Sequence, residues 1–275
     1  NKLEAAAALM RRGCDLKVLT DSVQSAQAIT AFGKERGVCF KVLIEIDTDD
    51  HRSGIKPGSE ALLAVALALE SPACEIVGVM THAGSSYDLN TPEALIAMAE
   101  QERSGCVHAA ERLRQAGFAC PIVSIGSTPT ALSATNLEGV TEVRAGVYVF
   151  FDLVKYNVGV CTKNEIALSV LTSVIGHQEE KGWAIVDAGW MAMSRDRGTQ
   201  KQTADFGYGQ VCDVNGLVLE GYTISGANQE HGIVSRSGEL DLDIAHRFPI
   251  GTQFRILPNH ACATGAQFPE YQALD

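Results

Sequence analysis

The spacing of apolar residues follows two alternating periods over the first 155 residues. Stretches with helical spacing alternate with short apolar, β-branched runs, and Pro92 stands where the first turn of a helix accepts proline. The predicted helices span residues 3–12, 22–36, 59–69, 91–116 and 129–134, and the predicted strands span 16–20, 40–46, 75–81, 121–125 and 142–144. Helices and strands that alternate at this spacing indicate βαβ units and a parallel sheet.

The pattern changes after about residue 155, where long helical periods stop. Apolar and polar residues then alternate in five segments, at 166–176, 183–188, 210–213, 218–224 and 253–257. This alternation is typical of half-buried strands and predicts a second, mostly antiparallel β domain. We therefore assign residues 1–157 to an α/β domain and residues 158–275 to a β domain.

The α/β half contains five predicted β–α units, whereas a closed (β/α)8 barrel of the TIM type takes eight. The chain also begins inside a predicted helix, without an initiator methionine. We expect a barrel that lacks its first strands in this chain, and the alternative is an open sheet.

Composition and charge exclude several classes of protein. The chain is 46% hydrophobic and 20% charged, which is enough to bury a core. Its net charge of −11 disfavours nucleic acid and anionic membrane surfaces as partners. No apolar run reaches the length of a membrane span. The eight cysteines form no C-x-x-C pair, so we expect reduced thiols and a cytoplasmic location.

Polar, glycine-bearing segments follow the predicted parallel strands at one end only. These segments are residues 21–22, 47–54, 81–87, 126–130 and 144–148. Functional residues of α/β sheets and barrels collect at the carboxyl ends of the strands. The sequence therefore predicts an active site on this rim. His82 lies there, although a histidine considered alone is more often structural. A calcium loop is excluded because Arg52 occupies the sixth position from Asp47, where an EF-hand needs glycine.

The last two of these loops suit a phosphate group. We expect an anion within reach of backbone N–H groups at residues 126–128 and 146–148, because barrels often bind phosphate with their last two βα loops. The alternative is a pair of ordinary turns with helix-capping hydroxyl groups.

A candidate metal site lies near the end of the chain. His260 and Cys262 follow an apolar strand, and residues two apart on an extended segment point to the same side. An imidazole and a thiolate suit zinc best, while manganese or magnesium could occupy so open a site. The alternative is a buried thiol beside an unrelated histidine.

Taken in order, these motifs resemble those of the D-serine dehydratase-like family. The residues that carry the resemblance are 51–54, 81–84, 126–130, 144–148, 187–189, 229–232 and 258–262. The family comprises pyridoxal 5'-phosphate lyases of the alanine racemase fold. The resemblance implies a (β/α)8 barrel, a C-terminal β domain, and a homodimer with active sites shared between the two subunits.

The same resemblance implies residue roles. The phosphate would lie near Ser127, Thr128, Gly146, Val147 and Tyr148, and the pyridine ring near Arg52, His82, Tyr87 and Arg144. His82 and Arg52 would be catalytic, and His260 and Cys262 would hold the metal. The family's Schiff-base lysine stands in a Pro-His-x-Lys context, and none of the nine lysines here does. We therefore expect that lysine to be absent from this chain.

The implied reaction is dehydration of a β-hydroxy D-amino acid. We expect D-threo-3-hydroxyaspartate to yield oxaloacetate and ammonia, and D-serine to yield pyruvate. Arg195 or Arg197 would meet the distal carboxylate, and Gln229 is a further candidate substrate contact. The alternatives are an aldolase of the D-threonine type, which tends to carry Asp in place of Cys262, and a non-catalytic protein that binds the cofactor or metal.

Overall fold

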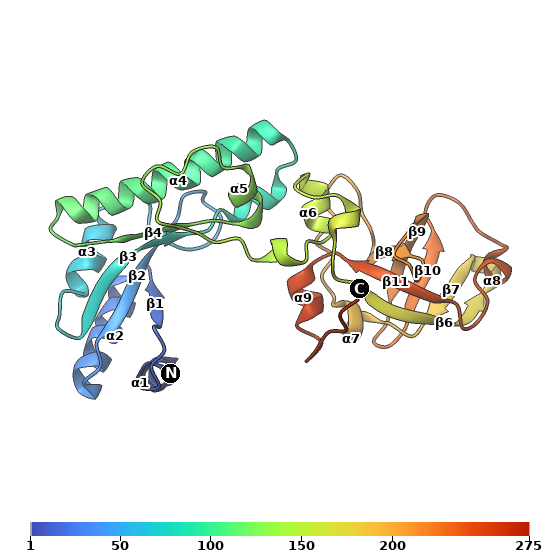
Figure 1. Cartoon of the computed structure of the whole chain (residues 1–275), viewed down its shortest axis with the longest axis horizontal. Helices are drawn as coiled ribbons and strands as arrows, with labels where there is room; N and C mark the ends of the chain where they lie inside the picture. The colour runs from blue at the N-terminus through green and yellow to red at the C-terminus, as the bar shows by residue number, and fades with distance from the viewer. Residues whose placement is uncertain (1, 275) are drawn as a thin grey trace. The chain divides into compact units, whose positions relative to one another are not determined.

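The computed structural model describes residues 2–274, which divide into two compact units between Gly146 and Val147 (Figure 1). The division precedes the short helix α6 (Leu153–Val158), whereas the sequence pattern put the boundary after residue 157, inside that helix. Leu153 explains the difference, because it is fully buried in a cluster with Ile166, Phe206 and Leu257 of the second unit. No helix of residues 2–274 is long and apolar enough to cross a membrane.

The first unit is a five-stranded parallel sheet with its strands in sequence order. The strands are β1 (Lys17–Thr20), β2 (Phe40–Ile46), β3 (Cys74–Thr81), β4 (Ile122–Ile125) and β5 (Glu142–Val143). The helices are α1 (Lys2–Arg11), α2 (Val23–Arg36), α3 (Ala61–Ala68), α4 (Pro92–Gln115) and α5 (Thr128–Ser133), with a 3-10 turn η1 (Gly84–Asp88). This is the βαβ architecture that the sequence predicted.

Local chemistry fixes where these helices begin. Ser22, Thr91 and Ser127 precede α2, α4 and α5 in extended conformation, and each side chain accepts a backbone hydrogen bond from the first turn. Figure 1 shows α4 lying along the sheet, and its buried stripe packs on β3 and β4. The core of the unit is built from residues such as Phe40, Ile44 and Leu113.

The second unit is a closed barrel of six antiparallel strands in the order β10–β7–β6–β11–β8–β9. They are β6 (Val170–Gln178), β7 (Trp183–Val186), β8 (Gly209–Cys212), β9 (Val218–Ala227), β10 (Gly232–Arg236) and β11 (Gln253–Pro258). Its short helices are α6, α7 (Trp190–Met193), α8 (Ile244–Arg247) and α9 (Ala261–Gly265), with 3-10 turns η2 (Val147–Val149), η3 (Lys163–Glu165) and η4 (Glu179–Lys181).

The barrel confirms the predicted β domain and adds one strand to it. β10 was missed because Ile233 and Val234 are adjacent, so apolar and polar residues do not alternate along it, and because it follows a polar turn. It pairs with both β9 and β7, so it closes the barrel. Phe248 fills the interior, where its ring packs edge-on against Tyr222 and Phe254 at centroid distances of 5.1 and 5.0 Å.

Candidate active site and metal-binding residues

The loops after β3, β4 and β5 bring His82, Gly126 and Arg144 together. His82 Nδ1 lies 3.2 Å from the carbonyl oxygen of Gly126. The Arg144 guanidinium donates to Ser124 Oγ at 2.6 Å and to the Thr81 carbonyl at 2.6 Å, which aligns the ends of these strands. The rim that the sequence predicted therefore exists as a connected cluster of side chains.

The hydrogen bond to Gly126 determines the state of His82. A carbonyl oxygen can only accept, so Nδ1 carries the proton and Nε2 is the unprotonated nitrogen of the neutral ring. Burial lowers the pKa of His82, and the charges of Arg52 and Arg144 lower it further. The ring is therefore neutral near pH 7 and presents Nε2 as an acceptor.

Two other predicted residues accompany His82. The Tyr87 ring lies 6.0 Å from the His82 ring, with an interplanar angle of 34°. Arg52 is exposed in the loop after β2, close enough for its charge to act on His82. The same loop is held by its own contacts, since Asp47 accepts from the backbone of Asp49 and Asp50 and pairs with Lys56 at 2.9 Å. The Asp47 carboxylate thus holds the turn of its own loop, while Asp49 accepts from the backbone N–H of Ser85 at 2.8 Å.

The structure corrects the expected backbone contribution to phosphate binding. The N–H of Gly126 donates to Glu102 at 3.1 Å, and that of Ser127 donates to Thr130 Oγ1 at 3.0 Å. Both groups are therefore used inside the protein. Ser127 Oγ also caps α5 and lies 2.8 Å from Ser86 Oγ. Thr128, the first residue of α5, is 2% exposed.

Gly126 itself is required by close packing. Its φ of 127° is unfavourable for other residues, and a Cβ atom there would lie 2.3 Å from the Arg144 carbonyl oxygen. Gly146 ends the first unit, while Val147 and Tyr148 begin the second in η2, where Tyr148 is exposed.

The predicted metal ligands lie in the second unit, but not as an extended pair. His260 is extended and caps α9, whereas Cys262 belongs to the first turn of that helix. The premise that both lie on one strand is therefore wrong. His260 Nδ1 is 2.6 Å from Asp196 Oδ2, and this hydrogen bond lowers the pKa of Asp196. The bond leaves Nε2 of His260 available as a ligand, which is a common arrangement for metal-binding histidines.

Buried polar groups hold this segment in place. Asp152 accepts from the backbone N–H of Ala261 at 2.9 Å, and Asn259 donates to the carbonyls of Asp196 and Gly207 at 3.1 and 2.7 Å. Asp152 is fully buried and Asn259 is 2% exposed. Among residues 2–274, no group of three or more His, Cys, Asp or Glu side chains is arranged as a metal cage.

The candidate substrate residues differ in how they are engaged. Arg197 pairs with Asp205 at 2.9 Å and lies 5.1 Å from the centroid of the Tyr208 ring. Arg195 is exposed, with its guanidinium 4.5 Å from the centroid of the Trp190 ring. Gln229 is exposed in the turn between β9 and β10, and its carbonyl accepts from the N–H of Met191 at 3.1 Å.

Known proteins resemble both units. The alanine racemase N-terminal domain family matches residues 2–154, and the serine dehydratase domain family matches residues 167–274. D-threo-3-hydroxyaspartate dehydratase from Delftia sp. (strain HT23) is 65% identical over the whole chain, which spans 73% of that protein. Its solved structure superimposes with a TM-score of 0.97 over 99% of this chain and 73% of that one. The chain belongs to the D-serine dehydratase-like family.

Two more distant proteins are also similar. D-serine dehydratase from Dictyostelium discoideum is 26% identical over 94% of this chain and 68% of that protein. D-threonine aldolase from Filomicrobium marinum shares the fold, with a TM-score of 0.73 and 21% identity over 92% of this chain and 64% of that one. Two of these relatives are named as dehydratases, a class of lyase.

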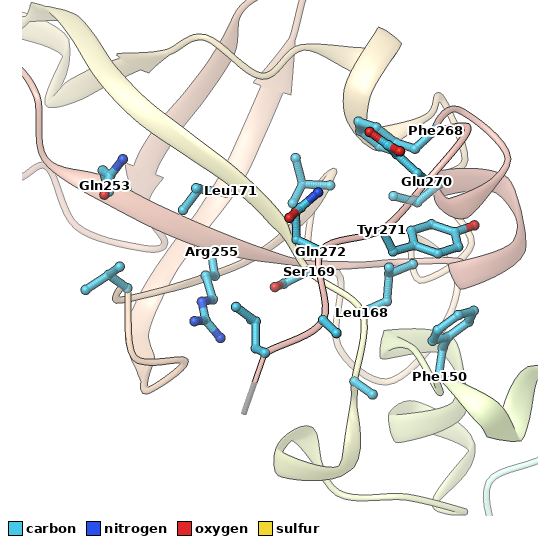
Figure 2. A pocket seen from close by; sticks show the side chains of 16 residues that line it. Phe150, Leu168, Ser169, Leu171, Gln253, Arg255, Phe268, Glu270, Tyr271 and Gln272 are labelled. Carbon is cyan, nitrogen blue, oxygen red and sulfur yellow. The ribbon is translucent and has the colours of Figure 1, made fainter.

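A cavity of about 700 Å³ lies in the barrel unit (Figure 2). It is lined by β6 and β11 residues such as Leu171 and Arg255, and by the segment after α9 that carries Phe268 and Tyr271. None of the predicted site residues lines it, and its walls are mainly apolar.

Two carboxylates near the histidines were not predicted from the sequence: Asp196, which contacts His260, and Glu102, which accepts from backbone N–H groups beside His82. Asp196 was visible only as part of a polar loop, and nothing in the sequence paired it with His260. Glu102 did leave a signal. The buried positions of α4 include Leu95, Ala99, Glu102, Cys106, Ala109 and Leu113. Glu102 thus occupies an apolar position of the helical repeat, and a carboxylate there indicates a specific buried partner.

Proposed function

We propose that the protein is a dehydratase, dependent on pyridoxal 5'-phosphate and a divalent metal, that acts on β-hydroxy D-amino acids. D-threo-3-hydroxyaspartate is the proposed preferred substrate, converted to oxaloacetate and ammonia, and D-serine would give pyruvate and ammonia. The observation that carries the proposal is the hydrogen bond from His260 to Asp196, with Cys262 in the next turn. Cytoplasmic location and a homodimer remain predictions from the thiols and from the family resemblance.

The donor set supports the metal part of the proposal. His260 Nε2 and the Cys262 thiol are a nitrogen and a sulfur ligand, the pair that zinc accepts most readily. For the 65% identical dehydratase, solved structures include a histidine-to-alanine variant and a cysteine-to-alanine variant in a metal-free form. The two substituted residues stand two positions apart in that protein, as His260 and Cys262 do here.

The rim supports the cofactor part. Arg52 and Arg144 supply positive charge, Tyr87 supplies an aromatic face beside His82, and Thr128 begins α5 after the β4 loop. We propose phosphate contacts from Thr128, Gly146, Val147 and Tyr148. Lys56, the lysine of the β2 loop, pairs with Asp47 and Asp50, and no lysine of this chain is assigned the covalent role.

The chemistry divides between the bound groups and the chain. When bound, pyridoxal phosphate withdraws electrons from the substrate amine's Cα, and the metal is a Lewis acid toward the β-hydroxyl. His82 offers a neutral Nε2 that accepts a hydrogen bond or a proton. Arg144 keeps the strand ends aligned through Ser124 and Thr81. Asp196 holds the His260 ring so that Nε2 points away from the carboxylate.

An assay of products on three substrates tests the proposal. The full-length protein should form oxaloacetate from D-threo-3-hydroxyaspartate and pyruvate from D-serine, and should not cleave D-threonine to glycine. Cys262→Ala should abolish both dehydrations, whereas Cys14→Ala, at another exposed cysteine, should leave them unchanged. Glycine formation from D-threonine as the main reaction would favour an aldolase. No turnover by cofactor-loaded, metal-loaded protein would overturn the proposal in favour of a binding role.

The substrate preference has its own test in the two arginines. Arg195 is exposed, and we propose that it binds the distal carboxylate of hydroxyaspartate, a group that D-serine lacks. Arg195→Ala should therefore raise KM for hydroxyaspartate and leave KM for D-serine unchanged. Arg197 holds Asp205 and packs on Tyr208, so Arg197→Ala should impair both substrates through the loop. Equal losses on both substrates for Arg195→Ala would contradict a role in binding the distal carboxylate.

A further inference from the structure

Glu102 is a buried carboxylate that joins three separate segments of the first unit. Its side chain is 1% exposed on α4. Oε1 accepts from the backbone N–H of Ala83 at 2.9 Å and of Gly126 at 3.1 Å, and Oε2 accepts from Thr130 Oγ1 at 2.7 Å. One side chain thereby fixes the β3 loop, the β4 loop and the first turn of α5.

Both backbone contacts of Oε1 lie directly beside His82. Ala83 follows His82 in the chain, so its N–H belongs to the peptide that carries the histidine carbonyl. Gly126 provides the carbonyl oxygen that holds the ring through Nδ1. A single oxygen atom of Glu102 thus binds the backbone on both sides of the imidazole, at Ala83 and at Gly126.

Stability alone does not account for this carboxylate. Burial raises the pKa of Glu102 despite the three hydrogen bonds and the nearby charge of Arg144, so the ionised form is costly in the folded protein. An apolar side chain would continue the buried stripe of α4 formed by Ala99 and Cys106. The arrangement favours a role in the site.

We propose that Glu102 is a positioning residue that holds His82 in the Nδ1-protonated tautomer through Ala83 and Gly126. Nε2 of His82 then remains unprotonated and can accept a hydrogen bond from the cofactor or substrate. The consequence for cofactor binding rests on the proposed function, whereas the tautomer itself does not. The two parts are therefore measured separately.

Two substitutions separate geometry from charge. Glu102→Gln keeps the reach and an acceptor oxygen but removes the charge. Glu102→Asp keeps the charge but is one methylene too short to reach all three donors. Glu100→Gln is the matched control, because Glu100 lies on the same helix, is exposed and contacts Arg103.

The primary readouts are the ¹⁵N shifts of the His82 ring and hydrogen exchange, measured on full-length protein without cofactor. Wild type, Glu102→Gln and Glu100→Gln should show the Nδ1-protonated tautomer, and Glu102→Asp should show a mixture. In Glu102→Gln, exchange at Ala83 and Gly126 should be about five- to tenfold faster, because an amide oxygen accepts more weakly than a carboxylate. Exchange at Val79 and Val123 should not change.

Several results would overturn the proposal. One is a wild-type His82 protonated at Nε2, and another is an unchanged tautomer in folded Glu102→Asp. If Glu102→Asp does not fold, Glu102→Gln decides, since unchanged exchange at Ala83 and Gly126 would refute their dependence on Glu102. In a second arm, titration with pyridoxal phosphate should show weaker binding to Glu102→Asp than to wild type. If wild type does not bind the cofactor, the proposed function fails while the tautomer result stands.

Discussion

At the scale of single residues, two histidines owe their state to a neighbouring acceptor. His260 is fixed by the Asp196 carboxylate and His82 by the Gly126 carbonyl, so each presents Nε2. Residue type and position after a strand made His260 and Cys262 candidate metal ligands and placed His82 and Arg144 on the predicted rim, whereas the roles of His82 and Arg144 came from the family resemblance. Their orienting partners depend on contacts between segments far apart in sequence, which no local pattern encodes.

Removal of the Asp196 carboxylate should weaken metal binding. Asp196→Asn replaces the carboxylate with an amide that accepts more weakly and can also present its NH2 group to the ring, so His260 is held less firmly. Weakening of such a partner typically costs about 10- to 100-fold in metal affinity. Equilibrium titration with zinc against a competing chelator measures this. Asp243→Asn is the control, because Asp243 lies near His246 in an exposed pair 3.7 Å apart. Equal affinity for Asp196→Asn and wild type would contradict the orienting role.

Glu102 should also make stability depend on pH in a recognisable direction. Its folded-state pKa is raised above the ordinary value of 4.5, so the folded protein binds the proton more tightly than the unfolded chain. This contribution is fully present below about pH 4.5 and is lost as pH rises through the folded pKa. Relative to Glu102→Gln, the wild type should therefore gain free energy of unfolding as pH falls toward 4.5, measured by urea denaturation.

Glu100→Gln provides a control of opposite sign. The hydrogen bond from Arg103 lowers the pKa of Glu100, so its small contribution is present above the unfolded value and disappears as pH falls below it. A gain in the wild type over Glu102→Gln as pH rises would contradict the buried, destabilised carboxylate.

At the scale of elements, the sequence predicted the long helices and the parallel strands well, because their periodicity and their caps agree. Thr91 and Pro92 mark the start of α4, and Ser22 marks the start of α2. Short elements were harder to predict from the sequence. α9 holds only five residues, so its first turn, which contains Cys262, reads as a continuation of β11. The conformation of such short elements is set by tertiary contacts, such as the hydrogen bond that the Ala261 N–H donates to the Asp152 carboxylate.

The turn from β4 into α5 should tolerate no side chain at its glycine. Gly126→Ala would place Cβ against the Arg144 carbonyl, so the β4 and β5 ends must separate. We expect a loss of at least about 2 kcal/mol in free energy of unfolding and weaker cofactor binding. Gly117→Ala is matched, since Gly117 also has a positive φ of 95°, but a methyl group added there would have nothing within 4 Å. Equal losses for both would show that backbone strain alone is responsible.

At the scale of the whole molecule, the two units contribute different chemistry. The candidate cofactor groups His82 and Arg144 belong to the parallel-sheet unit, and the candidate metal ligands His260 and Cys262 belong to the barrel unit. The change of period near residue 155 made this division visible in the sequence.

Because the units hold different groups, metal and cofactor should be separable. A chelator should abolish dehydration while the absorbance of bound pyridoxal phosphate stays largely intact, since His260 and Cys262 hold no part of the proposed cofactor contacts. Adding back zinc, manganese or magnesium to the chelated protein should restore turnover, and it should restore none in Cys262→Ala. Absorbance and product formation followed in the same sample measure both properties. Simultaneous loss of cofactor and activity on chelation, or full activity of metal-free Cys262→Ala protein, would refute a Lewis-acid role for this pair.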